Sequence, residues 1–191
     1  MMRLLTVIIF SFSLPVLADV RLWVPSTTTA GNIGGRAGAD ELCDDDVNKP
    51  AVASSTTRAF ISVSAADEIR DMPSLYNIPT NEVIFRRDGT TQIAPNFAAL
   101  LNADTVDLTN SIGVTLRFIW TASDSIGSHT SSCNNWNSAS NSESGERGIA
   151  SAKINIYIGG NVSSCNESSS LYCITYTAPA GASASTGLTE W

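Results

Sequence analysis

Basic side chains are scarce in this sequence. Its 191 residues include 18 Asp and Glu but only 11 Lys and Arg and one His, which gives a formal net charge of −7. The only lysines are Lys49 and Lys153. Nucleic acids, heparin-like polyanions and anionic membranes are bound mainly through basic patches. The composition therefore argues against all three as the main partner.

Long apolar segments are missing beyond the N-terminus. No stretch after residue 18 approaches the roughly 20 apolar residues that a membrane-spanning helix needs. The first 18 residues, MMRLLTVIIFSFSLPVLA, combine Arg3, an apolar run and a small residue, Ala18, at the expected cleavage point. This pattern is typical of a secretory signal peptide, and the residue directly after Ala18 is Asp19 rather than the cysteine that would carry a bacterial lipid anchor. We predict a protein that is secreted, periplasmic or on the cell surface.

The rest of the chain has the length of one domain. Residues 19–177 are enough to bury a hydrophobic core and contain all the strand and helix signals. Residues 178–191, APAGASASTGLTEW, have no hydrophobic periodicity. We therefore expect one domain over 19–177, after a signal peptide at 1–18 and before a flexible tail at 178–191.

All four cysteines, Cys43, Cys133, Cys165 and Cys173, follow the predicted signal peptide. An even number of cysteines in an oxidising compartment indicates two disulfides. Zinc binding is the alternative, but spacings of 90, 32 and 8 residues fit no compact C-x-x-C site. Four cysteines allow three pairings, and their spacing does not choose among them.

Strand signals outnumber helix signals and predict an α+β fold. We expect strands at 19–26, 57–64, 115–121, 152–159 and 171–177, and a hairpin over 82–94 around Asp88-Gly89. One short helix should follow the glycines of residues 31–35 and bury Cys43, and another should span 94–101 near Pro95. The acidic run at residues 44–46 is interpreted as a solvated helix end rather than a calcium site.

A strongly polar segment, TASDSIGSHTSSCNNWNSASNSESGER, covers residues 121–147. A segment of this length inside a domain is functional or mobile, and Cys133 at its middle favours an ordered, tethered loop. Asn and Ser side chains offer hydrogen-bond donors and acceptors at low net charge, which suits adaptable recognition. The predicted ligand-binding residues of the loop 122–147 are Asp124, His129, Asn134, Asn135, Asn137, Glu143 and Glu146.

Six segments in order carry a family resemblance: GNIGGRAGADELC, RAFIS, DGTTQIAPNFAALL, FIWTASDSIG, CNNWNS and CNESSSLYCITY. Together they resemble the C-type-lectin-like fold, and within it the endostatin-type domains of collagens and a bacterial exported family of unassigned function. The resemblance implies short helices on twisted, mostly antiparallel strands. It also implies nested disulfides, Cys43–Cys173 and Cys133–Cys165, with Trp120 and Trp136 packed beneath the polar loop. An exposed, sugar-stacking Trp136 is the alternative.

The resemblance does not extend to the family's ligand sites. Lectin sugar sites of this fold hold calcium with a Glu-Pro-Asn or Gln-Pro-Asp triplet and a Trp-Asn-Asp sequence. Here Ser138 follows Trp136-Asn137, and no proline lies between residues 121 and 147. Calcium is therefore not supported by a motif, and we expect no cofactor. The arginine-rich heparin surface and histidine zinc site of endostatin-type domains are not expected either, because the chain is acidic and has only His129.

A hydrolytic site is the least favoured reading. His129, Ser131, Ser132 and Asp124 could form a triad, but all lie in one loop without a G-x-S-x-G nucleophile elbow. Glu143 and Glu146 are interpreted as solvated charges. We expect an exported, non-enzymatic recognition or adhesion module that binds an extracellular protein or glycan. A structural cell-envelope protein without a specific ligand is the alternative.

Overall fold

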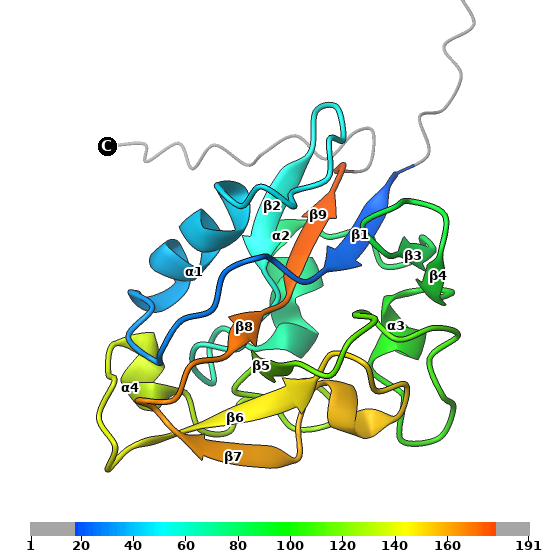
Figure 1. The fold of residues 1–191 in the computed structure, drawn as a ribbon. Coiled ribbons are helices and arrows are strands. Elements are labelled where there is room, and N and C mark those ends of the chain that lie inside the picture. The colour runs from blue at the N-terminus through cyan, green and yellow to red at the C-terminus, as the bar shows by residue number, and fades with distance from the viewer. Residues whose placement is uncertain (1–17, 179–191) are drawn as a thin grey trace, which may run out of the picture.

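The computed structural model describes residues 18–178. The predicted signal peptide and tail lie outside this range, except for Ala18 and Ala178 at their inner ends. The described chain forms two sheets connected by short helices (Figure 1). Within residues 18–178, no helix is long and apolar enough to cross a membrane.

The two sheets contain nine strands. One sheet has the order β2-β9-β1-β3-β4 and the other has the order β7-β6-β5-β8. β1 pairs with β3 and β5 with β8 in parallel, and the five other pairings are antiparallel. The strands are β1 (Val20–Trp23), β2 (Thr56–Ala59), β3 (Ile84–Phe85), β4 (Gln92–Ala94), β5 (Phe118–Trp120), β6 (Ser144–Ile149), β7 (Asn161–Ser164), β8 (Ser170–Leu171) and β9 (Cys173–Tyr176). The predicted α+β class is confirmed.

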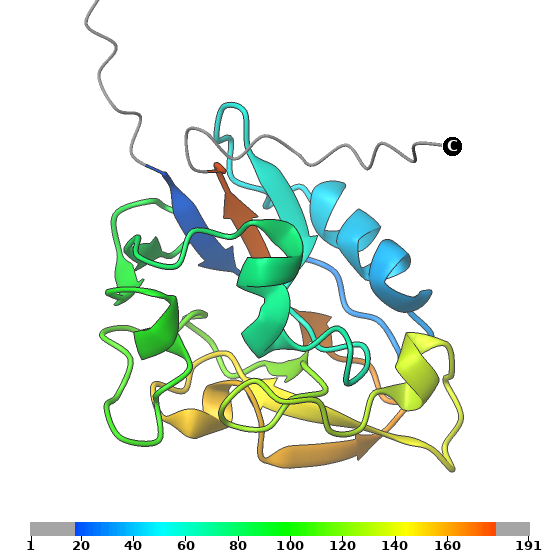
Figure 2. The same ribbon diagram turned by 180° about the vertical axis from the view of Figure 1, so that it is seen from behind.

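Short helices cover the sheets. They are α1 (Gly35–Asp44), η1 (Ile69–Asp71), α2 (Met72–Tyr76), α3 (Phe97–Leu100), α4 (Cys133–Trp136) and η2 (Asn155–Tyr157). The helix predicted to bury Cys43 is α1, which lies beside β2 (Figure 1). From the other side, α2 lies across the five-stranded sheet (Figure 2). The helix predicted near Pro95 is α3, which Asn96 caps by accepting a hydrogen bond from the Ala99 N–H at 2.8 Å.

The hairpin predicted around Asp88-Gly89 is formed by β3 and β4. The Asp88 carboxylate accepts hydrogen bonds from the N–H groups of Thr90 and Thr91, both at 2.8 Å. Gly89 has a φ of 71°, a conformation that glycine adopts without a Cβ penalty. Local turn chemistry therefore accounts for this element.

Both disulfides have the nested pairing that the resemblance implies. Cys43–Cys173 ties α1 to β9, the strand between β1 and β2, and Cys133–Cys165 ties α4 to the residue after β7. The loops they close span 130 and 32 residues. In a chain-entropy treatment they stabilise the fold by at most about 5 and 4 kcal/mol, respectively.

Two groups of buried side chains form the core. The larger lies between the sheets and includes Tyr157 and Tyr172. The Tyr157 hydroxyl donates to Leu100 O at 2.7 Å, and the Tyr172 hydroxyl donates to Tyr157 O at 2.9 Å. Burial raises the pKa of both phenols above the ordinary value. The smaller group surrounds both disulfides with Trp23, Trp120 and Trp136.

One predicted strand was wrong, and another was too long. Residues 152–159 form no strand. They contain the 3-10 turn η2, which buries Tyr157 against β6. A Cβ on Gly148 of β6 would lie 1.9 Å from Tyr157 O, so only glycine permits this close approach. The strand predicted over 57–64 ends at Ala59, because Phe60 and Ser62 donate their N–H groups to Tyr172 and Thr121 outside any regular ladder.

Asp46 is buried, which corrects the interpretation of the acidic run as a solvated helix end. Its carboxylate accepts hydrogen bonds from the N–H and hydroxyl of Ser26 at 2.8 and 2.7 Å, and from the Asn48 N–H at 2.7 Å. Burial opposes ionisation, but these hydrogen bonds outweigh it and lower the pKa of Asp46. Asp46 thus joins the loop before α1 to the loop after it.

We expect Asp46→Asn to reduce the free energy of unfolding by about 2 kcal/mol at pH 7. The side-chain NH₂ group of Asn would replace one carboxylate oxygen and could not accept the hydrogen bonds that this oxygen accepts. The folded pKa is below the unfolded value, so the stabilisation is complete above about pH 4 and is lost as the pH falls through the folded pKa. Urea unfolding at pH 7 and pH 3 should therefore show a smaller difference from wild type at pH 3. Asp45→Asn at the exposed neighbour is the control. Equal stability of both variants at pH 7 would contradict this role.

Candidate functional site

The polar segment 122–147 is folded rather than one continuous loop. It contains α4 and most of β6, and isolated bridges join Ser123 to His129 and Ser132 to Gly145. The prediction of an ordered, tethered segment is confirmed, but its last residues belong to a sheet. α4 lies at the corner of the molecule, beside the start of α1 (Figure 1).

The backbone of α4 is left-handed. Cys133, Asn134, Asn135 and Trp136 have φ angles of 50°, 56°, 53° and 65°. A left-handed helical conformation costs about 1–2 kcal/mol per L-residue, and Asn tolerates it better than most. Four such residues in succession persist only where their surroundings hold them, and strained backbone of this kind is concentrated at functional sites.

Several contacts hold α4 in this conformation. The Ser132 hydroxyl accepts a hydrogen bond from the Asn135 N–H at 3.3 Å, and the Gly34 N–H donates to Trp136 O at 2.9 Å. The Cys133–Cys165 disulfide fixes the first residue. A Cβ on Gly145 would lie 2.8 Å from Cys133 Sγ, so β6 approaches the disulfide closely only because it carries glycine there.

Trp120 and Trp136 form the floor beneath α4. Both are fully buried, and their rings meet edge to face with centroids 5.7 Å apart. The Trp120 indole N–H donates to Thr29 O at 2.9 Å, and the Trp136 indole N–H donates to Ser62 O at 2.7 Å. The framework role that the resemblance implies is confirmed. The alternative of an exposed, sugar-stacking Trp136 is wrong, because no face of its ring reaches solvent.

The outward side chains of this corner are amides. Asn134, Asn135 and Asn137 are all exposed. The Asn137 amide donates to Asn135 O at 3.0 Å, which closes the end of the turn. Within the described residues, the side chain of Asn134 makes no hydrogen bond. The structure therefore brings these three predicted residues together at one exposed corner, where the Asn134 side chain keeps its donors and acceptor free of partners among the described residues.

Asp124 belongs to a different part of the segment. Its Oδ1 accepts hydrogen bonds from the N–H groups of Ile126 at 3.1 Å and Ser128 at 2.8 Å. Together with Glu146 it lines a pocket of about 290 Å³. Within residues 18–178, no group of three or more His, Cys, Asp and Glu side chains is placed to hold a metal ion.

The two glutamates differ from each other. Glu146 is buried, and its Oε1 accepts a hydrogen bond from the Gly160 N–H at 2.6 Å. The interpretation of Glu146 as a solvated charge is therefore wrong: it closes the loop between η2 and β7. Glu143 is half-buried, and its Oε2 is buried without a hydrogen-bond partner in the described residues. Neither glutamate side chain makes a hydrogen bond with the exposed amides of α4 within the described residues.

His129 contacts one of the other triad candidates. Its ring Nε2 lies 3.0 Å from the Ser132 hydroxyl, and its backbone N–H donates to Glu68 Oε1 at 2.9 Å. Asp124 uses its Oδ1 for its own turn, and Ser132 also caps α4. His129 and Ser132 thus connect α4 to Glu68.

Sequence reasoning missed the residues that support the corner from a distance. Ser62 accepts the Trp136 indole N–H, and its hydroxyl donates or accepts in a 2.7 Å hydrogen bond with Ser123. Glu68 lies 61 residues before His129 in the chain and forms an ion pair with Arg70. No local pattern marks either residue, and Gly145, which packs on the Cys133–Cys165 disulfide, belongs to no motif.

Comparison with known proteins yields one family. The model of the family described as "Protein of unknown function (DUF1554)" matches residues 26–153, about two thirds of the chain. The match begins after β1 and includes α1, α4 and β6. A comparison with curated proteins gives no match.

Proposed function

Because the chain belongs to the DUF1554 family, whose description assigns no activity, we propose its function from the site: it is an exported recognition module that binds an extracellular protein or glycan through the amides of α4. The observation that carries this proposal is the left-handed backbone of four consecutive residues, Cys133–Trp136. Such a turn is costly, and the disulfide and the buried Trp136 maintain it. Its result is two exposed, preorganised Asn side chains.

Preorganisation is what a polar recognition site needs. Ordering a flexible loop on binding costs about 0.5–1.5 kcal/mol for each immobilised side chain, and a rigid turn reduces that cost. Amide side chains present two donors and an acceptor each, and they pair with peptide groups and with sugar hydroxyls alike. The proposed site is non-enzymatic, since these amides are neither nucleophiles nor acids.

The finer proposal for the fold is a C-type-lectin-like domain of the endostatin-like type. It is supported by the nested disulfides and by the two tryptophans packed beneath the polar segment. Binding through α4 does not use the usual calcium site of that fold, because Ser138 stands where that site has a carboxylate. Export is supported by the disulfides, which form in oxidising compartments.

The test is a binding survey with a paired substitution. Wild-type protein and the Asn134→Asp/Asn135→Asp variant are applied to arrays of immobilised glycans and secreted proteins, in calcium and in excess chelator. Asp keeps the size of Asn and tolerates the left-handed conformation, but it has no N–H donors. We expect the variant to lose about tenfold or more in affinity, with no effect of the chelator.

Asn141→Asp is the matched control, because Asn141 is exposed in the same segment but outside α4. It makes the same chemical change and should leave binding intact. Binding that survives in the double variant would place the recognition surface elsewhere. A wild-type protein that binds nothing on either array would favour the alternative, a structural cell-envelope protein.

A further inference from the structure

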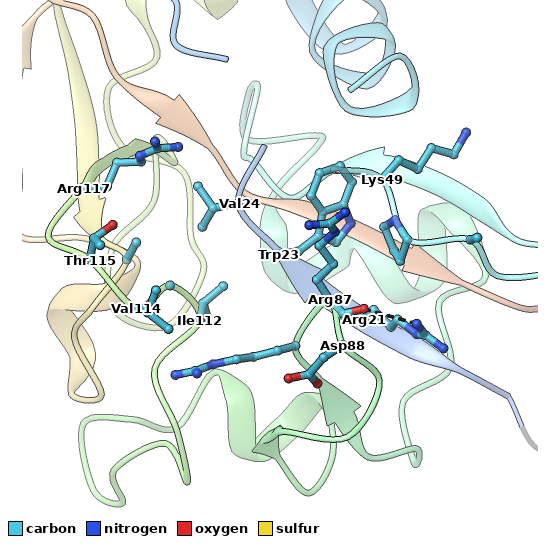
Figure 3. A pocket seen from close by; sticks show the side chains of 15 residues that line it. Arg21, Trp23, Val24, Lys49, Arg87, Asp88, Ile112, Val114, Thr115 and Arg117 are labelled. Carbon is cyan, nitrogen blue, oxygen red and sulfur yellow. Dashed lines mark hydrogen bonds between the residues drawn. The ribbon is translucent and has the colours of Figure 1, made fainter. Parts of the chain in front are cut away.

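A basic groove occurs in this acidic protein. It has a volume of about 790 Å³ and lies between β1, the β3–β4 turn and residues 112–117 (Figure 3). Five of the chain's 11 Lys and Arg residues line it, and Asp88 is the one acidic residue among its lining residues. The basic lining residues are Arg21, Lys49, Arg86, Arg87 and Arg117. Positive charge is therefore concentrated at one place on the molecule.

Three of these charges have no carboxylate partner among residues 18–178. Arg21 pairs with Asp19 and Lys49 with Asp44. Arg86, Arg87 and Arg117 take part in none of the ion pairs formed within residues 18–178. In an acidic protein with many carboxylates available, three unpaired arginines at one groove leave a local excess of positive charge.

Backbone contacts hold two of the unpaired guanidinium groups in place. Arg86 donates through Nε to Ser111 O at 2.6 Å and through Nη2 to the Ser111 hydroxyl at 2.9 Å, and Arg117 donates through Nη1 to Pro25 O at 2.9 Å. A neutral carbonyl fixes the orientation of a guanidinium without cancelling its charge. The planar fork of arginine matches a carboxylate with two parallel hydrogen bonds. Arg87 is exposed and makes no hydrogen bond through its side chain within the described residues.

Asp88 supplies one negative charge to this groove. Its Oδ1 accepts from the N–H groups of Thr90 and Thr91, and its Oδ2 accepts from the Thr91 hydroxyl at 2.7 Å. These hydrogen bonds hold the Asp88 carboxylate against Thr90 and Thr91 of the β3–β4 turn. Five basic side chains stand against Asp88 and the two carboxylates paired with Arg21 and Lys49, so the groove keeps a net positive charge.

The floor and one wall of the groove are apolar. Trp23, Ile112 and Ala150 are buried lining residues, and Val114 is 79% exposed on the wall that carries Arg117. In Figure 3, Arg117, Val114 and Ile112 lie on one side, and Arg21, Arg87 and Lys49 lie on the other. An occupant that spans the groove meets arginine at both sides and apolar side chains between them.

We propose that this groove binds an acidic peptide segment of a partner protein, in which Asp or Glu side chains neighbour apolar ones. The carboxylates would pair with Arg86, Arg87 and Arg117, and the apolar side chains would cover Ile112 and Val114. The net charge of −7 disfavours a long polyanion or an anionic membrane, because either would extend beyond the basic groove onto acidic surface. A short acidic segment meets only the groove.

This surface is distinct from the proposed amide site. Both ribbon views place α4 and the β3–β4 hairpin at opposite sides of the molecule (Figures 1 and 2). The two proposals therefore fail separately: the Asn134→Asp/Asn135→Asp variant should keep its affinity for an acidic peptide.

The test is selection from a phage library of random linear heptapeptides on the immobilised wild-type protein. We expect enriched sequences that combine Asp or Glu with apolar residues. One such peptide is then synthesised and titrated. Arg87→Gln should weaken it by about tenfold, and Arg87→Gln/Arg117→Gln should weaken it further. Because the Arg87 side chain makes no hydrogen bond in the described structure, the single variant should unfold at the wild-type temperature. Lys153→Gln, at an exposed lysine outside the groove, is the matched control.

Four results would overturn the proposal. They are a selection without enrichment, enriched peptides that lack acidic residues, equal affinity of wild type and Arg87→Gln, and loss of peptide binding in the Asn134→Asp/Asn135→Asp variant.

Two further measurements test whether something other than a peptide occupies the groove. Cosedimentation with phosphatidylglycerol vesicles that depends on Arg87 would favour a lipid surface. A wild-type dimer in sedimentation velocity that Arg87→Gln dissociates would favour a second copy of the chain. Either result would overturn the proposal that an acidic peptide occupies the groove.

Discussion

Removal of the Cys43–Cys173 disulfide is expected to lower the free energy of unfolding by about 3 kcal/mol. This bond closes a loop of 130 residues, and both cysteines are fully buried. It connects α1 to β9, which pairs with both β1 and β2. Without it, the unfolded chain gains conformational freedom, and α1 is joined to the sheet only by noncovalent contacts. We expect the unfolding temperature of Cys43→Ala/Cys173→Ala to fall by roughly 10 °C.

Differential scanning calorimetry of the oxidised proteins measures this effect. Cys133→Ala/Cys165→Ala is the matched control, because it removes a bond that closes only 32 residues and should lower the unfolding temperature less. The Cys133→Ala/Cys165→Ala variant should also leave α4 without its covalent link to residue 165. An unfolding temperature of Cys43→Ala/Cys173→Ala within a degree or two of wild type would show that the bond contributes little to the fold.

Trp136→Ala is expected to reduce the free energy of unfolding by about 3–5 kcal/mol. The ring is fully buried against Trp120, and truncation leaves a cavity beneath α4. It also leaves Ser62 O without the indole N–H that it accepts at 2.7 Å. Because the ring anchors the last residue of the left-handed turn, the exposed amides should lose their fixed arrangement together with the stability.

Trp136→Phe separates the contribution of the buried ring from that of the indole N–H hydrogen bond. It keeps most of the apolar ring but has no N–H, so a loss of about 1–3 kcal/mol is expected in urea unfolding. Amide hydrogen exchange of residues 132–138 then reports whether the turn itself has loosened. If Trp136→Ala cost less than about 1 kcal/mol, the ring would not be the support of α4.

Elements governed by neighbouring residues were predictable. The Asp88-Gly89 hairpin and the start of α3 follow from turn and cap chemistry within a few residues. Residues 152–159 were mispredicted as a strand because alternating apolar residues there also suit a short turn that buries Tyr157. Periodicity over so short a segment does not distinguish the two conformations.

Of the seven residues predicted for the candidate site, the structure places only three amides together on α4 and its end. Asn134, Asn135 and Asn137 were recognised from composition, whereas their left-handed support depends on Ser62, Gly34 and Cys165 far away in the chain. Glu146 was assigned to solvent because its neighbours are polar. Its burial follows from the packing of β6 against the loop at Gly160, which a local pattern does not encode.

By itself, the sequence determined the α+β class, the oxidation of all four cysteines and the overall scarcity of positive charge, since these depend on composition and on local backbone preference. Only the tertiary structure decided where that scarce charge lies. Arg21, Lys49, Arg86 and Arg117 come from separate parts of the chain, and sheet pairing and loop packing bring them to one groove. The same applies to α4, because a strained backbone persists only when distant residues hold it.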